Sequence, residues 1–299
     1  MRLADAGART INIVGAGEPT IDPTFTDIIE YISQLGLKVL VATNGIVIAK
    51  NDDVLSLLQE AEASVVIKVN SRDPELQDTL VCRRGYAELR DQAIELLFAR
   101  GFNECKPTRL AFNTLVMKAN YHEVFEIFKF CRSNNIAFIS GDYMPTGRTY
   151  DSDFHGEAVL RAAALDSFQD LSKLYEPVTH QQREALRKKI AAFDEQEGLP
   201  VMDNPAYVSG LPCVQALGVQ VDNEGGIWHC PARNKIIDDK LVQEKLSDLD
   251  EFKSFNHLWK SNPYIRTIIE NHDGGCPYKQ IALKDDRDSK ECHEFKKHS

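Results

Sequence analysis

The sequence lacks any apolar run that approaches the length of a membrane span, and it lacks a segment with the pattern of a secretion signal. A transmembrane helix needs about 20 consecutive apolar residues. Positive charge is also scarce, because 45 acidic residues against 35 basic ones give a net charge of −10. That balance disfavours nucleic acid and anionic membranes as partners. We therefore expect a soluble cytoplasmic protein that contacts neither nucleic acid nor membrane.

A glycine-flanked carboxylate near the start of the chain is the most informative feature that is present. A short β-branched strand from Ile11 leads into Gly15-Ala16-Gly17, followed by Glu18 and Pro19. Glycine has no Cβ, so this backbone can approach a ligand closely, and the proline prevents further strand pairing. Glu18 would then lie where parallel sheets and barrels bind ligands, able to bind an amine. On its own, the pentapeptide fits an ordinary strand-to-helix turn equally well.

A helix is predicted directly after this turn. Asp22 and Pro23 are typical of a helix N-cap with proline at the first helical position. Apolar residues then follow at helical spacing, namely Phe25, Ile28, Ile29, Ile32 and Leu35. Strand, turn and helix would form one βα unit.

The same pattern recurs along the next hundred residues. Four further strands are predicted, at Leu37 to Ala42, Val65 to Val69, Leu110 to Val116 and Ile136 to Ser140. Amphipathic helices lie between them at about 51–61, 85–100 and 121–134. Polar residues end or follow each strand, including Thr43-Asn44-Gly45 and Asn70-Ser71-Arg72. Strict alternation of strand and helix predicts a parallel barrel or open barrel.

Four polar motifs follow one another in a fixed order, namely Gly-Glu-Pro at 17–19, Thr-Asn-Gly at 43–45, Lys-x-Asn-Ser at 68–71 and Pro-x-Gly-Arg at 145–148. This order resembles the radical S-adenosylmethionine (radical SAM) superfamily over roughly residues 8–150. The fold implied is α/β, a partial parallel (β/α) TIM-like barrel that lacks its first strand, with a small α+β C-terminal cluster-binding extension.

The resemblance implies a site for S-adenosyl-L-methionine. Gly17, Glu18 and Pro19 match a motif that binds the amino group of its methionine moiety, with Ala16 in place of the family's first glycine. Thr43 and Asn44 would line the same cavity. The remaining implied contacts are to the ribose or carboxylate, from Lys68, Asn70 and Ser71, and to the adenine, from the strand around Asn113 to Met117. For Asn70, Ser71 and Asn113 a capping or turn-forming role is an equal alternative.

One departure from the family pattern concerns the catalytic cluster. The family's Cys-x-x-x-Cys-x-x-Cys loop precedes Gly-Glu-Pro, whereas the first cysteine here is Cys82. Only ten residues precede Ile11, too few for a unit of roughly 30 residues, and Ala4 to Ala8 resembles the end of a helix. We expect either a truncated coding region or a natural derivative that lost the cluster, and no cleavage of S-adenosylmethionine by these 299 residues alone.

The C-terminal third resembles the SPASM and twitch extensions of the same superfamily. An alternating strand, a turn at 222–226 and a returning strand are predicted between Cys213 and Cys230, with eleven residues before Gly225 and four after it. By resemblance, one auxiliary four-iron four-sulfur cluster would be held by Cys213, Cys230, Cys276 and Cys292. Zinc is the competing occupant, less favoured because no Cys-x-x-Cys pair exists, and disulfides rank last. Separate thiols are expected at Cys82, Cys105 and Cys131, the last buried on a helix face.

Three segments are predicted from these patterns. Residues 1–150 would be the partial barrel and residues 151–200 two bridging helices, Glu157 to Tyr175 and His180 to Glu197. Residues 201–299 would be the cluster-binding extension, with a helical stretch from Leu241 to Glu270. The implied chemistry is reductive cleavage of S-adenosylmethionine and hydrogen abstraction from a peptide, protein or small-molecule substrate, with an electron donor such as flavodoxin or ferredoxin. The alternative is a non-enzymatic iron–sulfur binding or partner protein derived from this fold.

Overall fold

The protein is represented by a computed structural model, which describes residues 2–5, 7–14, 17–142, 176–200, 219–222, 224–228, 236–237, 240–241, 245–252 and 254–262. The chain divides into two compact units, Leu3–Asp203 and Asn204–Ser299. No helix of these described ranges is both long and apolar enough to cross a membrane.

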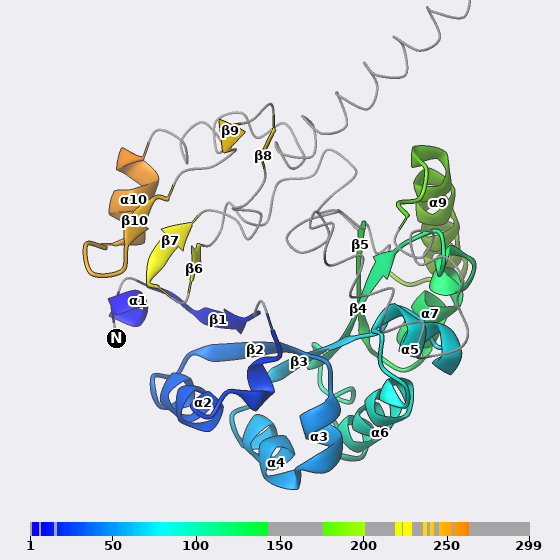
Figure 1. The fold of residues 1–299 in the computed structure, drawn as a ribbon, viewed down its shortest axis with the longest axis horizontal. Helices are drawn as coiled ribbons and strands as arrows, with labels where there is room; N and C mark the ends of the chain where they lie inside the picture. Colours follow the sequence, from blue (N-terminus) through cyan, green and yellow to red (C-terminus); the bar gives the residue numbers. More distant parts are fainter. Residues whose placement is uncertain are drawn as a thin grey trace, which may run out of the picture. The chain divides into compact units, whose positions relative to one another are not determined.

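The first unit is built on a sheet of five parallel strands in the order β1-β2-β3-β4-β5 (Figure 1). The strands are β1 (Thr10–Ile13), β2 (Lys38–Thr43), β3 (Ser64–Lys68), β4 (Leu110–Val116) and β5 (Ala137–Asp142). Each strand pairs in parallel with the next one along the chain. All five strands lie within two residues of their predicted positions, so the α/β class with a parallel sheet is confirmed.

Helices lie between successive strands along the chain and on the outer face of the sheet, while one short helix precedes β1 and another helix follows β5 (Figure 1). They are α1 (Arg2–Asp5), α2 (Phe25–Gln34), α3 (Ile46–Lys50), α4 (Asp52–Glu60), α5 (Pro74–Leu80), α6 (Tyr86–Ala99), α7 (Tyr121–Ser133) and α9 (His180–Gln196). The helices predicted at 51–61, 85–100, 121–134 and 180–197 are confirmed. The short helices α3 and α5 were not predicted. The helix α1 ends at Asp5 rather than at Ala8. The helix predicted at 157–175 lies outside the described residues.

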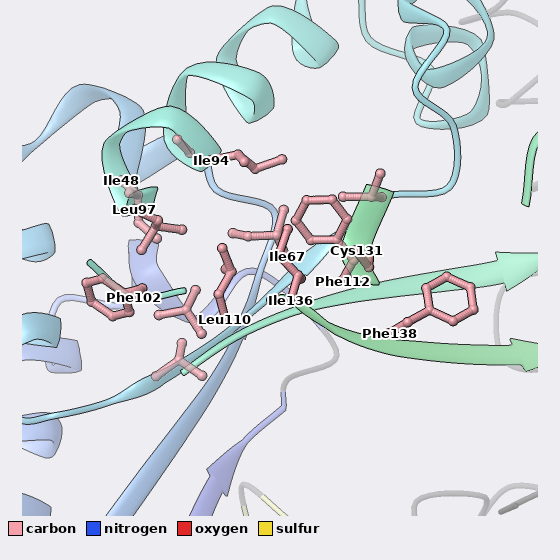
Figure 2. Packing of buried hydrophobic residues seen from close by; sticks show 14 of the residues in the cluster. Ile48, Ile67, Ile94, Leu97, Phe102, Leu110, Phe112, Cys131, Ile136 and Phe138 are labelled. Atoms are coloured by element: carbon pink, nitrogen blue, oxygen red, sulfur yellow. The ribbon is translucent and has the colours of Figure 1, made fainter. Parts of the chain in front are cut away.

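The core lies between the sheet and its helices, as Figure 2 shows. Ile67 on β3, Leu97 on α6 and Phe112 on β4 are each at most 1% exposed. Cys131 is fully buried among them, as predicted from its helix face. Burying each large apolar side chain contributes roughly 1.5–3 kcal/mol. Successive side chains of a strand point to opposite faces of the sheet. Lys68, which follows Ile67 on β3, therefore faces the side of the sheet opposite to this core.

The turn after Glu18 corrects one prediction. Asp22 and Pro23 do not begin a helix, because the 3₁₀ helix η1 (Pro19–Ile21) comes first and Asp22 is its C-cap. The Asp22 carboxylate instead accepts hydrogen bonds from the main-chain nitrogen of Thr24 at 2.8 Å and from its hydroxyl at 2.6 Å. Such local side-chain bonds favour turns over helix. The helix α2 starts two residues beyond the predicted N-terminus, at Phe25.

The second unit contains a small antiparallel sheet in the order β10-β7-β6. Its strands are β6 (Gln220–Val221), β7 (Gly226–Trp228) and β10 (Ser247–Asp248), and a separate pair joins β8 (Ile236–Ile237) to β9 (Lys240–Leu241). The hairpin predicted between Cys213 and Cys230 is therefore present as β6 and β7. The four predicted cluster ligands Cys213, Cys230, Cys276 and Cys292 lie outside the described residues.

The predicted helix from Leu241 to Glu270 is wrong in its first half. Leu241 ends β9, and Ser247–Asp248 pair with β7, with the main-chain nitrogen of Leu246 donating to the Ile227 carbonyl at 2.8 Å. Among the described residues of this stretch, only Phe255–Ser261 are helical, as α10, and Ser254 caps that helix. Strand pairing with residues twenty positions away outweighs local helix propensity here.

Candidate functional site

The carboxylate of Glu18 joins the carboxyl ends of β1 and β2. Its Oε1 accepts hydrogen bonds from the Thr20 hydroxyl and the Thr43 hydroxyl, each at 2.6 Å, and from the Thr20 main-chain nitrogen at 3.2 Å. Its Oε2 accepts one bond, from the Asn44 main-chain nitrogen at 2.6 Å. Residues predicted from two separate motifs therefore form one site.

Glu18 keeps spare acceptor capacity. A carboxylate offers about two lone pairs on each oxygen, so Oε1 with three donors is saturated, whereas Oε2 has room for another donor. In the part of the chain that the structure describes, no lysine or arginine forms an ion pair with Glu18. The neighbouring Gly17 is exposed, and a Cβ there would meet nothing within 4 Å. The site is thus a carboxylate held by four donors next to an exposed glycine.

The conformation of the Thr43-Asn44-Gly45 turn orients the groups that donate to the Glu18 carboxylate. Gly45 has a φ of +83°, and a Cβ there would lie 3.1 Å from the Cβ of Ala93 on α6. Its main-chain nitrogen donates to the Thr43 hydroxyl at 3.1 Å, which orients that hydroxyl to donate onward to Glu18. The Asn44 side chain accepts from the main-chain nitrogen of Ile46 at 2.9 Å, closing the first turn of α3.

A half-buried cation lies further along the same sheet. Lys68 on β3 and Asn113 on β4 are register partners, and the lysine Nζ donates to the Asn113 Oδ1 at 3.0 Å. Burial lowers the pKa of Lys68 from 10.5 to about 8, because desolvation disfavours the charged form. Within the described ranges no carboxylate pairs with it. An ammonium has three donors, so two remain for an anionic ligand.

Asn70 and Ser71 are held by the fold itself. Asn70 Oδ1 accepts from the Leu115 main-chain nitrogen at 3.0 Å, and the Ser71 hydroxyl donates to a carboxylate oxygen of Glu123 at 2.5 Å. The main-chain nitrogens of both residues donate to Gln77 Oε1, at 3.0 and 2.9 Å. These contacts shape the loop after β3, and a ligand role for the two side chains stays a prediction.

Two buried side chains near the site had no signal in the sequence. Arg90 on α6 is fully buried and donates through Nη1 to the Ser71 carbonyl at 2.6 Å and to Gln77 at 3.1 Å. Tyr86, 3% exposed, donates its hydroxyl to the Asn44 carbonyl at 3.2 Å. Both lie on α6, where the sequence pattern alone would place a charged residue such as Arg90 on the solvent side, so only the tertiary structure shows these two contacts.

Metal ligands do not cluster in the described part of the chain. No group of three or more histidine, cysteine or acidic residues there could hold a metal ion. Cys82 and Cys105 are half-buried, and burial raises the pKa of the fully buried Cys131 to about 12. Such a thiol behaves as a small apolar core residue.

A family model matches the first part of this chain, and two known proteins are similar to it over most of its length. Residues 1–131 match the model of the radical SAM superfamily. A probable GTP 3',8-cyclase of Methanothermobacter marburgensis is 24% identical over 272 residues, covering 88% of this chain and 83% of the cyclase. The mycofactocin maturase MftC of Mycobacterium ulcerans is 23% identical over 267 residues, covering 88% of this chain and 64% of the maturase.

The fold is similar to that of a solved structure, Streptococcus suis SuiB bound to S-adenosylmethionine. The TM-score is 0.59 at 17% identity, with 91% of this chain and 63% of SuiB covered. The chain thus spans less than two thirds of MftC and of SuiB. The parallel sheet and the family match agree on the first part of the chain. The similarity to the radical SAM superfamily therefore lies in residues 1–131, the part of the chain that holds β1 to β4.

Proposed function

We propose that the carboxyl edge of the five-stranded sheet binds S-adenosylmethionine and that the protein serves in radical SAM chemistry. The observation that carries this proposal is the Glu18 carboxylate, which four protein donors hold in place while Oε2 keeps room for another. A fixed carboxylate beside open backbone is suited to an ammonium group. The five strands would belong to a partial (β/α) barrel that lacks its first strand.

The donor set of the site fits a zwitterionic amino acid moiety. Glu18 Oε2 would accept from the ammonium, and Lys68, with two free donors and a pKa near 8, would pair with the carboxylate. Gly17 would let the ligand approach the backbone closely. Thr43 and Asn44 act on the ligand through Glu18, because the Thr43 hydroxyl and the Asn44 main-chain nitrogen both donate to its carboxylate.

When bound, S-adenosylmethionine and a catalytic four-iron four-sulfur cluster supply reductive cleavage of the cofactor and hydrogen abstraction from a substrate. The residues of this chain would bind the amino acid moiety, orient it and exclude water from it. A Cys-x-x-x-Cys-x-x-Cys loop is absent from these 299 residues, so no residue here is assigned to that cluster.

The C-terminal third would hold one auxiliary cluster on Cys213, Cys230, Cys276 and Cys292. Four thiolates suffice for one four-iron four-sulfur cluster. The antiparallel hairpin of β6 and β7 supports this assignment, because it lies between the first two cysteines. The similarity to MftC also covers 88% of the chain, well beyond residues 1–131.

The relatives favour two substrate classes. MftC is a mycofactocin maturase and the archaeal relative a probable GTP 3',8-cyclase. Both a peptide or protein and a small molecule therefore belong to the proposal, together with an electron donor such as flavodoxin or ferredoxin.

The proposal is tested by calorimetric titration of S-adenosylmethionine into the wild type and Glu18→Gln. A hydrogen bond between charged groups contributes about 1.5–3 kcal/mol, so we expect the variant to bind roughly ten- to hundredfold more weakly. Glu60→Gln, at an exposed position on α4, is the matched control and should bind like the wild type. Undiminished binding by Glu18→Gln would overturn the assignment.

A second candidate is a non-enzymatic iron–sulfur binding or partner protein derived from the radical SAM fold. The β6–β7 hairpin between Cys213 and Cys230 supports an auxiliary cluster in such a protein as well as in an enzyme. Anaerobically reconstituted protein should then produce no 5'-deoxyadenosine from S-adenosylmethionine under dithionite, and restoration of such a loop upstream should not change that. Activity gained with the loop would favour the enzyme instead.

A further inference from the structure

Tyr86 reaches the site from a different element. It is the first residue of α6, is 3% exposed, and donates its hydroxyl to the main-chain carbonyl of Asn44 at 3.2 Å. Asn44 lies 42 positions earlier, in the turn after β2. The contact therefore links α6 to the turn that carries one of the donors to Glu18.

Asn44 is constrained at three points. Its side-chain Oδ1 accepts from Ile46, its carbonyl accepts from Tyr86, and its main-chain nitrogen donates to Glu18 Oε2 at 2.6 Å. The first contact is local and the third is the one that touches the carboxylate. The Tyr86 hydroxyl comes from another element and fixes the 44–45 peptide unit, which directly follows the 43–44 unit whose nitrogen donates to Glu18.

We propose that Tyr86 is a positioning residue for ligand binding. It holds the Asn44 main-chain nitrogen on Glu18 Oε2. The second lone pair of that oxygen then stays directed at the ligand ammonium. This inference rests on the proposed function of Glu18. A freely rotating carboxylate would have to be ordered when the ligand binds, and that ordering weakens the observed affinity.

The hydroxyl is well suited to this task and dispensable for the helix. Burial raises the pKa of Tyr86 to about 12, so the phenol is a protonated donor at neutral pH. The N-terminus of α6 has its own anchor, because the Asp78 carboxylate accepts from the main-chain nitrogens of Gly85 and Ala87, the latter at 2.7 Å. Tyr86→Phe keeps the buried ring and removes only the contact to Asn44.

The test compares two ligands by calorimetry, S-adenosylmethionine and 5'-methylthioadenosine, which has the nucleoside but no amino acid moiety. Loss of one neutral hydrogen bond changes affinity by roughly three- to tenfold. We expect Tyr86→Phe to lose that factor for S-adenosylmethionine and nothing for 5'-methylthioadenosine. Tyr121→Phe is the matched control, since that hydroxyl also donates to a carbonyl, of Gln182 at 2.8 Å, and it should bind both ligands normally.

The double variant Glu18→Gln/Tyr86→Phe shows whether Tyr86 affects ligand affinity through Glu18. If Tyr86 acts through Glu18, Tyr86→Phe should cause no further loss once the carboxylate is gone. Equal losses for both ligands, an additive loss in the double variant, or unchanged affinity in Tyr86→Phe would each overturn the inference. When Glu18→Gln weakens binding but Tyr86→Phe does not, only this inference fails. When wild-type protein does not bind S-adenosylmethionine, or Glu18→Gln has no effect, the proposed function fails first and the inference falls with it.

Discussion

Replacing Lys68 by methionine should stabilise the protein and weaken ligand binding at the same time. Lys68 is a half-buried ammonium whose described partner is the neutral amide of Asn113, 3.0 Å away. The fold would be more stable with a carboxylate paired to Lys68, or with an apolar residue at position 68. Methionine has a similar length and no charge to desolvate, so it removes the cost of burial.

The size of the effect follows from the pKa of Lys68, which burial lowers from 10.5 to about 8. At about 1.36 kcal/mol per pKa unit, the charged lysine costs roughly 3 kcal/mol at pH 7. Asn113 loses its donor in the variant, which offsets about 1 kcal/mol. The net gain is about 2 kcal/mol, or roughly 4–8 °C in melting temperature for a unit of some 200 residues.

The pH dependence gives the sharper test. Between pH 8 and 10.5 the unfolded state binds the proton of Lys68 more tightly than the folded state does, so wild-type stability rises with pH across this window. The advantage of Lys68→Met should therefore be full at pH 7 and shrink toward pH 10.5. Scanning calorimetry at several pH values measures it, with the exposed Lys50→Met as control. A variant less stable than wild type at pH 7, or an advantage independent of pH, would refute the reasoning.

Three further outcomes are expected. Thr43→Val removes the 2.6 Å hydrogen bond to Glu18, so chemical denaturation should show a loss of about 1 kcal/mol in the free energy of unfolding. Calorimetry should show a several-fold weaker affinity for S-adenosylmethionine, and an unchanged affinity would contradict the role of Thr43. Gly45→Ala should lose about 1–3 kcal/mol in the same denaturation assay, because alanine is strained at a φ of +83° and its Cβ would crowd Ala93; wild-type stability would contradict it. Anaerobically purified protein should contain about four irons and four sulfides per chain by metal and sulfide analysis, whereas stoichiometric zinc without sulfide would exclude the auxiliary cluster.

The parallel sheet could be predicted because its signals are local. Buried strands such as Val65 to Val69 are short runs of β-branched residues, and turn residues separate them from amphipathic helices. Parallel strands also place their carboxyl ends at one edge. The meeting of Glu18 with Thr43 and Asn44 therefore followed from motif order alone.

Other parts depended on contacts that no local pattern encodes. The pairing of Lys68 with Asn113 is set by the register of β3 against β4, and Tyr86 reaches Asn44 only because α6 packs beside the turn. The helix predicted after Leu241 failed because β10 pairs with β7. At Asp22 a side-chain hydrogen bond to Thr24 competed with helix capping.

The most direct measurement is a crystal structure of the protein with S-adenosylmethionine bound. The account predicts the ligand ammonium at about 2.7–2.9 Å from Glu18 Oε2, with the contacts from Thr43 and Asn44 to the same carboxylate retained. A ligand bound elsewhere, or an ammonium that contacts groups other than Glu18, would contradict the central claim.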